Sequence, residues 1–140
     1  MKIAIIPARA GSKRIKKKNI KFFHGKPMIA WSIQAAIDSK VFDKVIVSTD
    51  HKDIAKIARE YGAETPFLRP EEISDDFTVT STVIKHAINN INLKKEDIES
   101  VCCIYATSPF ITPEDIKNGL IKLERGNWDY VFSATEYPSS

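Results

Sequence analysis

The stretch KIAIIPARAGSKRIKKKN, residues 2–19, joins a short apolar run to a loop rich in positive charge. Residues 2–7 are typical of a central strand in a parallel sheet, because such a strand is buried on both faces. The loop that follows carries six Lys or Arg side chains and one Gly before Asn19. We therefore expect a buried strand whose carboxyl end leads into a flexible cationic loop.

Strand-like and helix-like segments alternate along the rest of the chain. Apolar runs predict strands at 44–49, 64–68, 100–107 and 130–135, and helical spacing predicts helices at 27–39, 51–62, 80–91 and 112–126. This alternation predicts an α/β fold with three layers, in which helices cover both faces of a Rossmann-like parallel sheet. Ligands of such sheets bind beyond the carboxyl ends of the strands.

The connections and helix ends carry local signals. The segment 8–26 is the one long connection without predicted structure, and a loop of that length is usually functional. Thr112 and the Pro after it predict a capped start for the last helix. Thr80, or a neighbouring hydroxyl residue, is expected to cap the helix at 80–91. Asp50 suits the N-cap of the helix at 51–62 as well as it suits a ligand.

The charge distribution is uneven along the chain. The 140 residues, for which one domain is the natural expectation, carry a net charge of +3. Residues 1–37 contain nine Lys or Arg and no acidic residue, whereas the remaining 103 contain 12 basic and 18 acidic groups. A local positive field implies a local anion.

Composition excludes several classes of protein. The sequence has no run of 18 apolar residues for a membrane span and no secretion signal, so we expect a cytoplasmic protein that contacts no membrane. Cys102 and Cys103 are adjacent in a predicted strand and point to opposite faces, so we expect two buried free thiols.

The cationic loop matches neither of two familiar phosphate-binding patterns. It contains no GxGxxG and no GxxxxGK[ST]. Its small residues would still let backbone N–H groups approach a phosphate, while Arg9 offers a planar fork and lysines offer point charges. A polyphosphate would neutralise such a cluster. The alternatives are a solvated surface for Lys16, Lys17 and Lys21, and a nucleic-acid patch, which the acidic remainder and the lack of aromatic residues in 8–21 disfavour.

Five segments together resemble a known family. They are IIPARAGSKRIKKKNI (5–20), GKPMIAWSIQAA (25–36), VIVSTD (45–50), LRPEEISDDFT (68–78) and YATSPF (105–110). In this order they resemble the cytidylyltransferases that activate nine-carbon acidic sugars, namely pseudaminic acid cytidylyltransferase and the CMP-sialic acid synthetases. ISDDFT (73–78) and CCIYATSPF (102–110) look more like the pseudaminic branch.

The resemblance implies a fold and a reaction. The fold would be the nucleotide-diphospho-sugar transferase type of α/β sheet. The reaction would transfer CMP from CTP to the anomeric hydroxyl of a 2-keto sugar acid, releasing pyrophosphate. Two alternatives stay open: a nucleotidyltransferase for another base or sugar, including sialic acid itself, and a non-catalytic module that binds polyphosphate or nucleic acid.

The resemblance also implies roles for particular residues. Arg9 and Lys18 would act as catalytic residues that stabilise charge on the oxygen between the α- and β-phosphorus. Arg69 would hold the cytosine and ribose, with a hydroxyl from Thr80 or Ser81. The remaining phosphate contacts would come from Ala8, Ala10, Gly11, Ser12 and Asn19.

The sugar side and the metal are less well defined by the sequence. Tyr105 stands where sialic acid synthetases carry a Gln that touches the sugar, and Thr107 belongs to the same motif. The resemblance implies Mg²⁺ with carboxylate ligands beyond residue 140. Asp75 and Asp76 could face the metal or solvate a loop, and His86 could be a core histidine or a base.

The resemblance finally bears on organisation. Residues 1–140 look like a single nucleotide-binding α/β domain, the N-terminal part of a longer cytidylyltransferase. The expected partners are CTP and an acidic nine-carbon sugar, without nucleic acid. The complete enzyme would be a homodimer.

Overall fold

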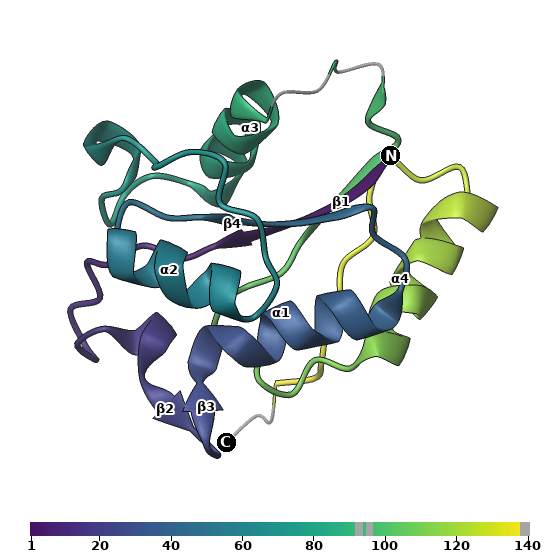
Figure 1. Ribbon diagram of the computed structural model, residues 1–140. Coiled ribbons are helices and arrows are strands. Elements are labelled where there is room, and N and C mark those ends of the chain that lie inside the picture. The colour runs from purple at the N-terminus through teal and green to yellow at the C-terminus, as the bar shows by residue number, and fades with distance from the viewer. Residues whose placement is uncertain (92–93, 95–96, 138–140) are drawn as a thin grey trace.

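A parallel sheet of three strands forms the centre of the computed structural model, which describes residues 1–91, 94 and 97–137. The strands β1 (Lys2–Pro7), β4 (Lys44–Ser48) and β5 (Ser100–Cys103) lie in the order β4-β1-β5. Residues 2–7 therefore form the central strand, as the opening stretch of the sequence predicts (Figure 1).

Helices cover both faces of this sheet (Figure 1). The helices α1 (Met28–Ser39), α2 (Lys52–Glu60) and α4 (Pro113–Arg125) lie on one face, and α3 (Thr80–Asn90) lies on the other. Ala4 and Ile6 of β1 pack into the core on the α1 side, whereas Ile3 and Ile5 pack with α3 residues. The three-layer α/β prediction is confirmed, and the alternation of side chains along β1 explains it.

The prediction that residues 8–26 lack structure is confirmed for residues 8–17, which form no helix or strand, and is wrong for residues 18–26. A 3-10 turn, η1 (Lys18–Ile20), is followed by a small hairpin of β2 (Phe22–Phe23) and β3 (Lys26–Pro27). His24 and Gly25, between the two strands, both have positive φ angles, 46° and 86°. Two positive φ angles are what a tight two-residue hairpin turn requires, and a Gly supplies one of them without strain.

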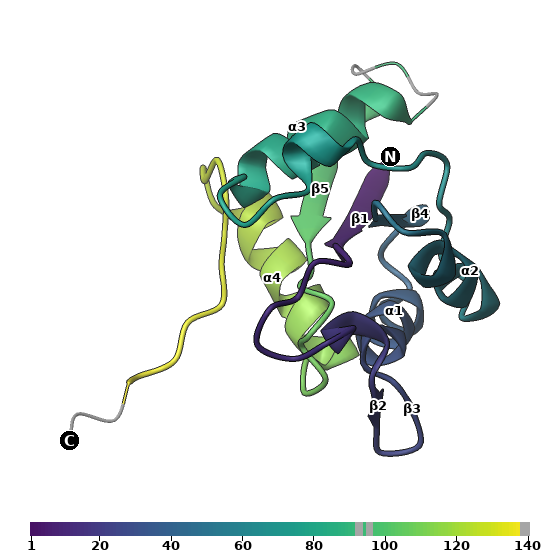
Figure 2. The ribbon, with the colours of Figure 1, turned by 90° about the vertical axis from the view of Figure 1, so that its left-hand side faces the viewer.

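Two strand predictions are also wrong. Among the described residues, the segment 64–68 pairs with β4 through a single isolated bridge, Ile46 with Glu64. Pro66 has no N–H to continue a ladder. The segment 130–135 forms no strand and is exposed, and Figure 2 shows it running away from the body. An apolar run becomes a strand only where a partner edge is in reach.

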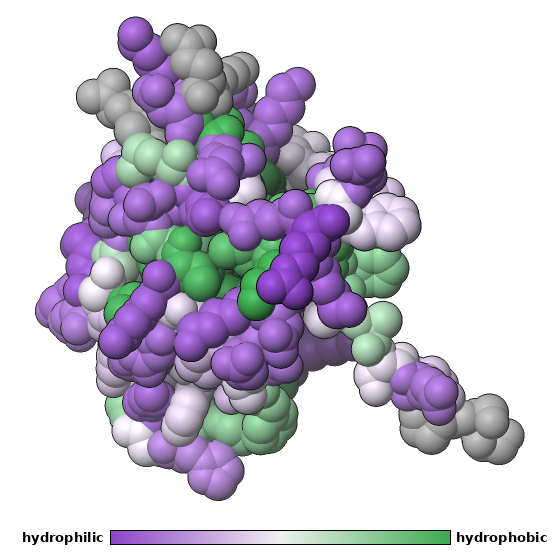
Figure 3. All heavy atoms as spheres, turned by 90° about the vertical axis from the view of Figure 1, so that its right-hand side faces the viewer, coloured by the Kyte–Doolittle hydropathy of each residue, from purple (hydrophilic) through white to green (hydrophobic). Residues whose placement is uncertain are grey.

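The outer edge of β5 is unpaired in the part of the chain that the structure describes. β5 itself ends at Cys103, earlier than the predicted 107. Cys102 is half-buried and Cys103 is exposed, so the prediction of two buried thiols is wrong for Cys103, although neither forms a disulfide. Figure 3 views the side of the molecule on which α4 lies and shows a band of hydrophobic surface between hydrophilic regions.

Helix ends confirm some predictions and correct others. The Thr112 hydroxyl accepts from the Asp115 N–H, and the Asp115 carboxylate accepts from the Thr112 N–H, so α4 begins with a full capping box. The cap of α3 is Val79, whose side chain cannot accept a hydrogen bond, so the prediction of a hydroxyl cap is wrong. The cap of α2 is His51 rather than Asp50.

No helix within the described ranges is both long and apolar enough to pass through a bilayer.

Candidate functional site

A cleft of about 590 Å³ opens at the carboxyl ends of β1 and β5, where α/β sheets bind their ligands. Two loops, the end of β1, the first half of α3 and the segment after β5 form its walls. We call residues 8–21 the cationic loop and residues 69–78 the acidic loop. The lining residues are Pro7, Arg9, Ser12, Lys13, Arg14, Ile15, Lys18, Asn19, Arg69, Ile73, Asp75, Asp76, Thr78, Thr80, Val83, Tyr105, Ala106 and Thr107.

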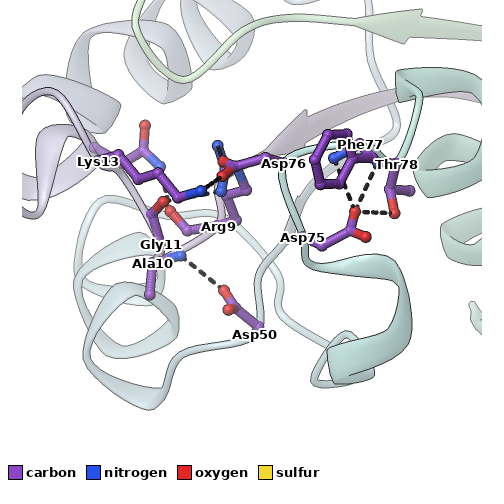
Figure 4. A network of polar contacts seen from close by, with 10 residues as sticks. Arg9, Ala10, Gly11, Lys13, Asp50, Asp75, Asp76, Phe77 and Thr78 are labelled. Carbon is purple, nitrogen blue, oxygen red and sulfur yellow. Dashed lines mark hydrogen bonds and ion pairs between the residues drawn. The ribbon is translucent and has the colours of Figure 1, made fainter.

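The backbone of the cationic loop is held on both sides of the peptide that joins Arg9 to Ala10. The Asn19 amide, which is buried, donates to the Arg9 carbonyl at 2.8 Å. The Asp50 carboxylate accepts from the Ala10 N–H at 2.9 Å (Figure 4). Asp50 follows β4, so parallel strand ends bring it next to the end of β1. Both bonds fix the point at which the Arg9 side chain leaves the loop.

Arg9 lies across the cleft from the acidic loop. One guanidinium nitrogen, Nη1, donates to the Gly11 carbonyl at 2.9 Å, and Nη2 lies 2.5 Å from Asp76 Oδ1 (Figure 4). The Lys13 ammonium pairs with the other Asp76 oxygen. These bonds from Lys13 and then Arg9 hold the pKa of Asp76 below its usual value. Lys18 lines the cleft, and its contact with phosphate stays a prediction.

The small residues of the cationic loop differ in what their N–H groups can do. The Ala8 N–H donates to the Ser48 carbonyl at 2.9 Å, and Ala8 itself belongs to the core rather than to the cleft lining. The Ser12 N–H donates to the Ala10 carbonyl at 2.8 Å, and that of Ala10 is held by Asp50. The Gly11 N–H makes no hydrogen bond within the described residues. Of these four small residues, only Ser12 lines the cleft; Ala8, Ala10 and Gly11 do not.

Arg69 is a buried cation. Its residue is 5 % exposed, and Nη2 donates to the Ser48 carbonyl at 3.2 Å, while Nε has no partner among the described residues. Burial lowers the pKa of Arg69; the Asp50 carboxylate opposes this shift and Arg9 adds to it. Arg69 forms no surface ion pair with the neighbouring Glu71 or Glu72 among the described residues. A buried guanidinium with a vacant donor is costly unless a ligand completes it.

A further wall comes from α3 and the segment after β5. The Thr80 hydroxyl lies 3.4 Å from the Tyr105 hydroxyl, and Tyr105 is 59 % exposed. The Tyr105 carbonyl accepts from the Ser32 hydroxyl at 2.8 Å, which fixes its backbone to α1. Thr107 lines the cleft, whereas Ser81 is exposed and does not. Of the two predicted hydroxyl residues, Thr80 is the one at the cleft.

The two adjacent aspartates of the acidic loop have different partners. Asp75 Oδ1 accepts from the Phe77 N–H at 3.0 Å, the Thr78 N–H at 2.7 Å and the Thr78 hydroxyl at 2.6 Å (Figure 4). The Thr78 bonds lower the pKa of Asp75. Asp75 therefore shapes its own loop, whereas Asp76 reaches across the cleft. The prediction that left both as metal ligands or solvated residues missed these two roles.

A metal centre does not assemble from the side chains that the structure describes. No group of three or more His, Cys, Asp or Glu side chains among them could hold a metal ion. Both aspartates at the cleft are already engaged, so the residues present do not fit a metal site. That metal ligands lie beyond residue 140 stays a prediction.

His86 does not line the cleft. Its ring packs edge-on against Phe67 with centroids 5.1 Å apart, and its buried Nδ1 has no partner in the described part of the chain. Of the two readings of His86, this position favours a core histidine over a base.

A second hollow, of about 750 Å³, lies over α4 and residues 126–132. It shares no lining residue with the cleft, and none of the predicted site residues lines it. The smaller cleft is therefore the better candidate for the functional site, because cationic side chains from distant parts of the chain line it.

The family model and the similar proteins agree on one family. The cytidylyltransferase family model matches residues 3–139. A pseudaminic acid cytidylyltransferase of Campylobacter jejuni is 40% identical over 135 residues, which cover 96% of this chain and 58% of the relative. A CMP-N,N'-diacetyllegionaminic acid synthase of Legionella pneumophila is 43% identical over 122 residues, covering 84% of this chain and 51% of the relative.

Solved structures show the same fold. A CMP:2-keto-3-deoxy-manno-octonic acid synthetase, solved with CTP, matches with a TM-score of 0.71 at 21% identity, covering 89% of this chain and 47% of that one. A cytidylyltransferase of Leptospira borgpetersenii matches with a TM-score of 0.69 at 17% identity, covering 90% and 50%.

The chain thus spans a little over half the length of the curated relatives that match it over 135 residues. Because the family model covers nearly every residue, from the central strand to the segment after α4, we conclude that this chain belongs to the cytidylyltransferase family.

Proposed function

We propose that residues 1–140 form the nucleotide-binding α/β domain of an enzyme that transfers CMP from CTP to a nine-carbon 2-keto sugar acid. Pseudaminic acid is the favoured sugar, since pseudaminic acid cytidylyltransferases are about 40% identical to this chain. The observation that carries the proposal is the convergence of Arg9, Lys18 and the buried Arg69 on one cleft at the strand ends.

The proposed chemistry asks mainly for positioning and charge. The anomeric hydroxyl oxygen attacks the α-phosphorus of CTP and loses its proton to solvent, and the bond from that phosphorus to the bridging oxygen breaks, so that pyrophosphate leaves. Arg9 and Lys18 would stabilise the negative charge that develops on the bridging oxygen. The Gly11 N–H would add a backbone donor. Losing one such donor typically costs about 3 kcal/mol in the transition state.

Arg69 would recognise the nucleoside end of CTP. Its guanidinium lies in the same cleft as the cationic loop and has a vacant Nε–H donor among the described residues. A carbonyl oxygen of cytosine or a ribose hydroxyl would accept from it, which offsets the cost of burying this cation.

Tyr105 and Thr107 would contact the sugar. Both line the cleft in the segment that follows β5, and Tyr105 is exposed enough to meet a ligand. Because a hydroxyl or ring that contacts one sugar discriminates against others, a Tyr105→Gln variant should change the relative turnover of pseudaminic and N-acetylneuraminic acid. The measurement is pyrophosphate release, with the Campylobacter jejuni relative assayed in parallel.

The metal and the assembly are further parts of the proposal. Cytidylyltransferases generally use a divalent metal ion, and we propose Mg²⁺ with ligands outside the described residues. The complete enzyme would be a homodimer. The partners are CTP and the sugar acid rather than nucleic acid.

Nucleotide binding gives the direct test of this function. Thermal shift with CTP, UTP, ATP and GTP, each with Mg²⁺, should show the largest rise for CTP, since a ligand at 100 times its Kd adds about 2.7 kcal/mol of stability. Arg9→Ala should abolish the CTP shift, and Arg9→Lys should restore part of it, because Lys keeps the charge but not the fork. Lys56→Ala, an exposed change on α2, is the control.

Three results would contradict the proposal. Equal shifts from all four nucleotides would indicate generic anion binding. An intact CTP shift in Arg9→Ala would remove the cationic loop from the site. Tight binding to random DNA with a steep salt dependence would favour a nucleic-acid module instead.

A further inference from the structure

The Asp76 carboxylate occupies the cationic loop of the free protein much as a phosphate would. Its Oδ1 lies 2.5 Å from Arg9 Nη2, and its Oδ2 pairs with the Lys13 ammonium. Figure 4 shows it pointing from the acidic loop toward these two cations. Carboxylates and phosphates use the same two recognition elements, the guanidinium fork and the ammonium point charge.

A phosphate and Asp76 compete for the same two cations. Arg9 Nη1 already donates to the Gly11 carbonyl. Lys13 is 80% exposed along its side chain, and Asp76 is its one ion-pair partner among the described residues. A phosphate chain that approaches Arg9 and Lys13 therefore meets a carboxylate of like charge already paired with both cations, and this repulsion favours displacement of the carboxylate.

The acidic loop is built so that Asp76 can leave without unfolding it. The turn that carries Asp76 is held by Asp75 through its three bonds to Phe77 and Thr78. Asp76 contributes none of these bonds, and its side chain is a quarter exposed, at 25%. Its removal from Arg9 leaves the turn intact.

We propose that Asp76 is an internal competitor for the phosphate subsite, which weakens the binding of phosphate chains and speeds the departure of pyrophosphate. This inference rests on the proposed function, since it takes the cationic loop to bind phosphates. When Asp76 is paired with Arg9 and Lys13 in most molecules, the apparent Kd of a phosphate ligand equals its intrinsic Kd divided by the fraction of molecules in which Asp76 has moved away. A nucleoside without phosphate does not need Arg9 or Lys13 and is unaffected.

This competition answers a chemical problem of the reaction. Pyrophosphate carries several negative charges and would stay on a cluster of Arg9, Lys13, Arg14 and Lys18. A carboxylate that returns to two of these cations lowers the cost of losing the product. It also limits the mutual repulsion of the cations when the cleft is empty.

Calorimetry with sodium tripolyphosphate and pyrophosphate in metal-free buffer tests the proposal. Asp76→Asn should lower the Kd of both ligands about three- to tenfold, the range expected for two partly exposed ion pairs. The gain should lie in slower dissociation, which stopped-flow displacement measures. The matched control is Glu72→Gln, the same charge change on the same loop, whose carboxylate forms no ion pair with a described residue. It should change Kd less than twofold.

The possible outcomes separate the two hypotheses. Equal Kd changes in Asp76→Asn and Glu72→Gln would overturn the competitor role while leaving phosphate binding established. Weaker binding by Asp76→Asn would overturn it as well, because the carboxylate would then support the ligand. Absence of tripolyphosphate and CTP binding in the folded wild type would overturn the proposed function and this inference together. Asp76→Ser serves as a second variant should circular dichroism show that Asp76→Asn is unfolded.

Discussion

The cationic loop and the acidic loop face each other across the cleft, but they are held in different ways. The cationic loop is tied to the rest of the fold, because the buried Asn19 amide and the Asp50 carboxylate grip its backbone at Arg9 and Ala10. The acidic loop is tied to the end of β4 at its first residue, where the Arg69 N–H donates to the Thr49 carbonyl at 2.8 Å. Its later residues are held mainly by bonds within the loop, through Asp75 and through the Ser74 hydroxyl, which donates to the Pro70 carbonyl at 2.7 Å. The cationic loop is therefore fixed before a ligand binds, whereas the acidic loop can move.

The largest expected effect comes from breaking the anchor of the cationic loop. Asn19→Ala leaves the Arg9 carbonyl without its buried partner, which should lower the free energy of unfolding by about 1–3 kcal/mol. Arg9 would then lose its fixed position, so tripolyphosphate affinity should fall about tenfold or more. Urea unfolding and calorimetry measure the two quantities.

Ser74→Ala is the matching change in the acidic loop. It removes an exposed bond within that loop, so both quantities should stay nearly unchanged. If Ser74→Ala lowered tripolyphosphate affinity as much as Asn19→Ala, the cationic loop would not be more firmly held than the acidic loop.

A second prediction concerns Asp50, whose substitution should change stability without weakening ligand binding. Asp50→Asn keeps an oxygen that can accept from the Ala10 N–H but removes the charge that supports buried Arg69. The free energy of unfolding should fall by about 1–3 kcal/mol, since a buried cation loses its compensating charge. Tripolyphosphate affinity should stay equal or tighten, because the cleft becomes more positive.

Asp129→Asn, the same charge change at an exposed residue, provides the control for Asp50→Asn. A large loss of tripolyphosphate affinity in folded Asp50→Asn would show that this carboxylate positions the loop through its charge rather than through its hydrogen bond.

A third, smaller effect is expected inside the cationic loop. A Cβ at Gly11 would lie 3.3 Å from Arg9 Nη1, so the guanidinium of Gly11→Ala must shift by a few tenths of an ångström. Tripolyphosphate affinity should fall about two- to fivefold by calorimetry, while stability stays equal or rises by about 0.5 kcal/mol. Ala10→Gly in the same loop is a useful comparison, because it adds no atom near Arg9. Unchanged affinity in Gly11→Ala would mean that Arg9 binds the ligand from another position.

The sequence predicts the fixed parts of this molecule better than the parts that depend on a distant partner. Residues 2–7 and the capped α4 follow from local patterns, because burial on two faces and a capping box are encoded within a few residues. The segments 64–68 and 130–135 have strand-like composition, yet a strand also needs a neighbouring edge and N–H groups to pair with it. Composition alone does not contain that information.

The site follows the same rule. The cationic loop and the presence of Arg69 beside it were predictable from the family motifs. The roles of Asp50 and Asp76 were not, because their partners lie far away in sequence, 40 residues in the case of the Asp50 bond to Ala10. Adjacent Asp75 and Asp76 look alike in the sequence, and only the fold assigns one to its own turn and the other to the opposite wall.

The smallest expected effect is a dependence of stability on pH, which tests whether the charge of Asp76 holds the acidic loop to the cationic loop. The pKa of Asp76 lies below its usual value of 3.8, first because of its bond with Lys13 and then because of Arg9. A depressed folded-state pKa means that the contribution of this carboxylate to stability is complete above about pH 3.8 and is lost as pH falls through the lower folded value. The difference in urea midpoint between wild type and Asp76→Asn should therefore be constant from about pH 5 to about pH 8 and shrink below pH 4. A difference that instead changed between pH 6 and pH 8 would assign the contact to another titrating group, and the two loops would then not be joined through Asp76.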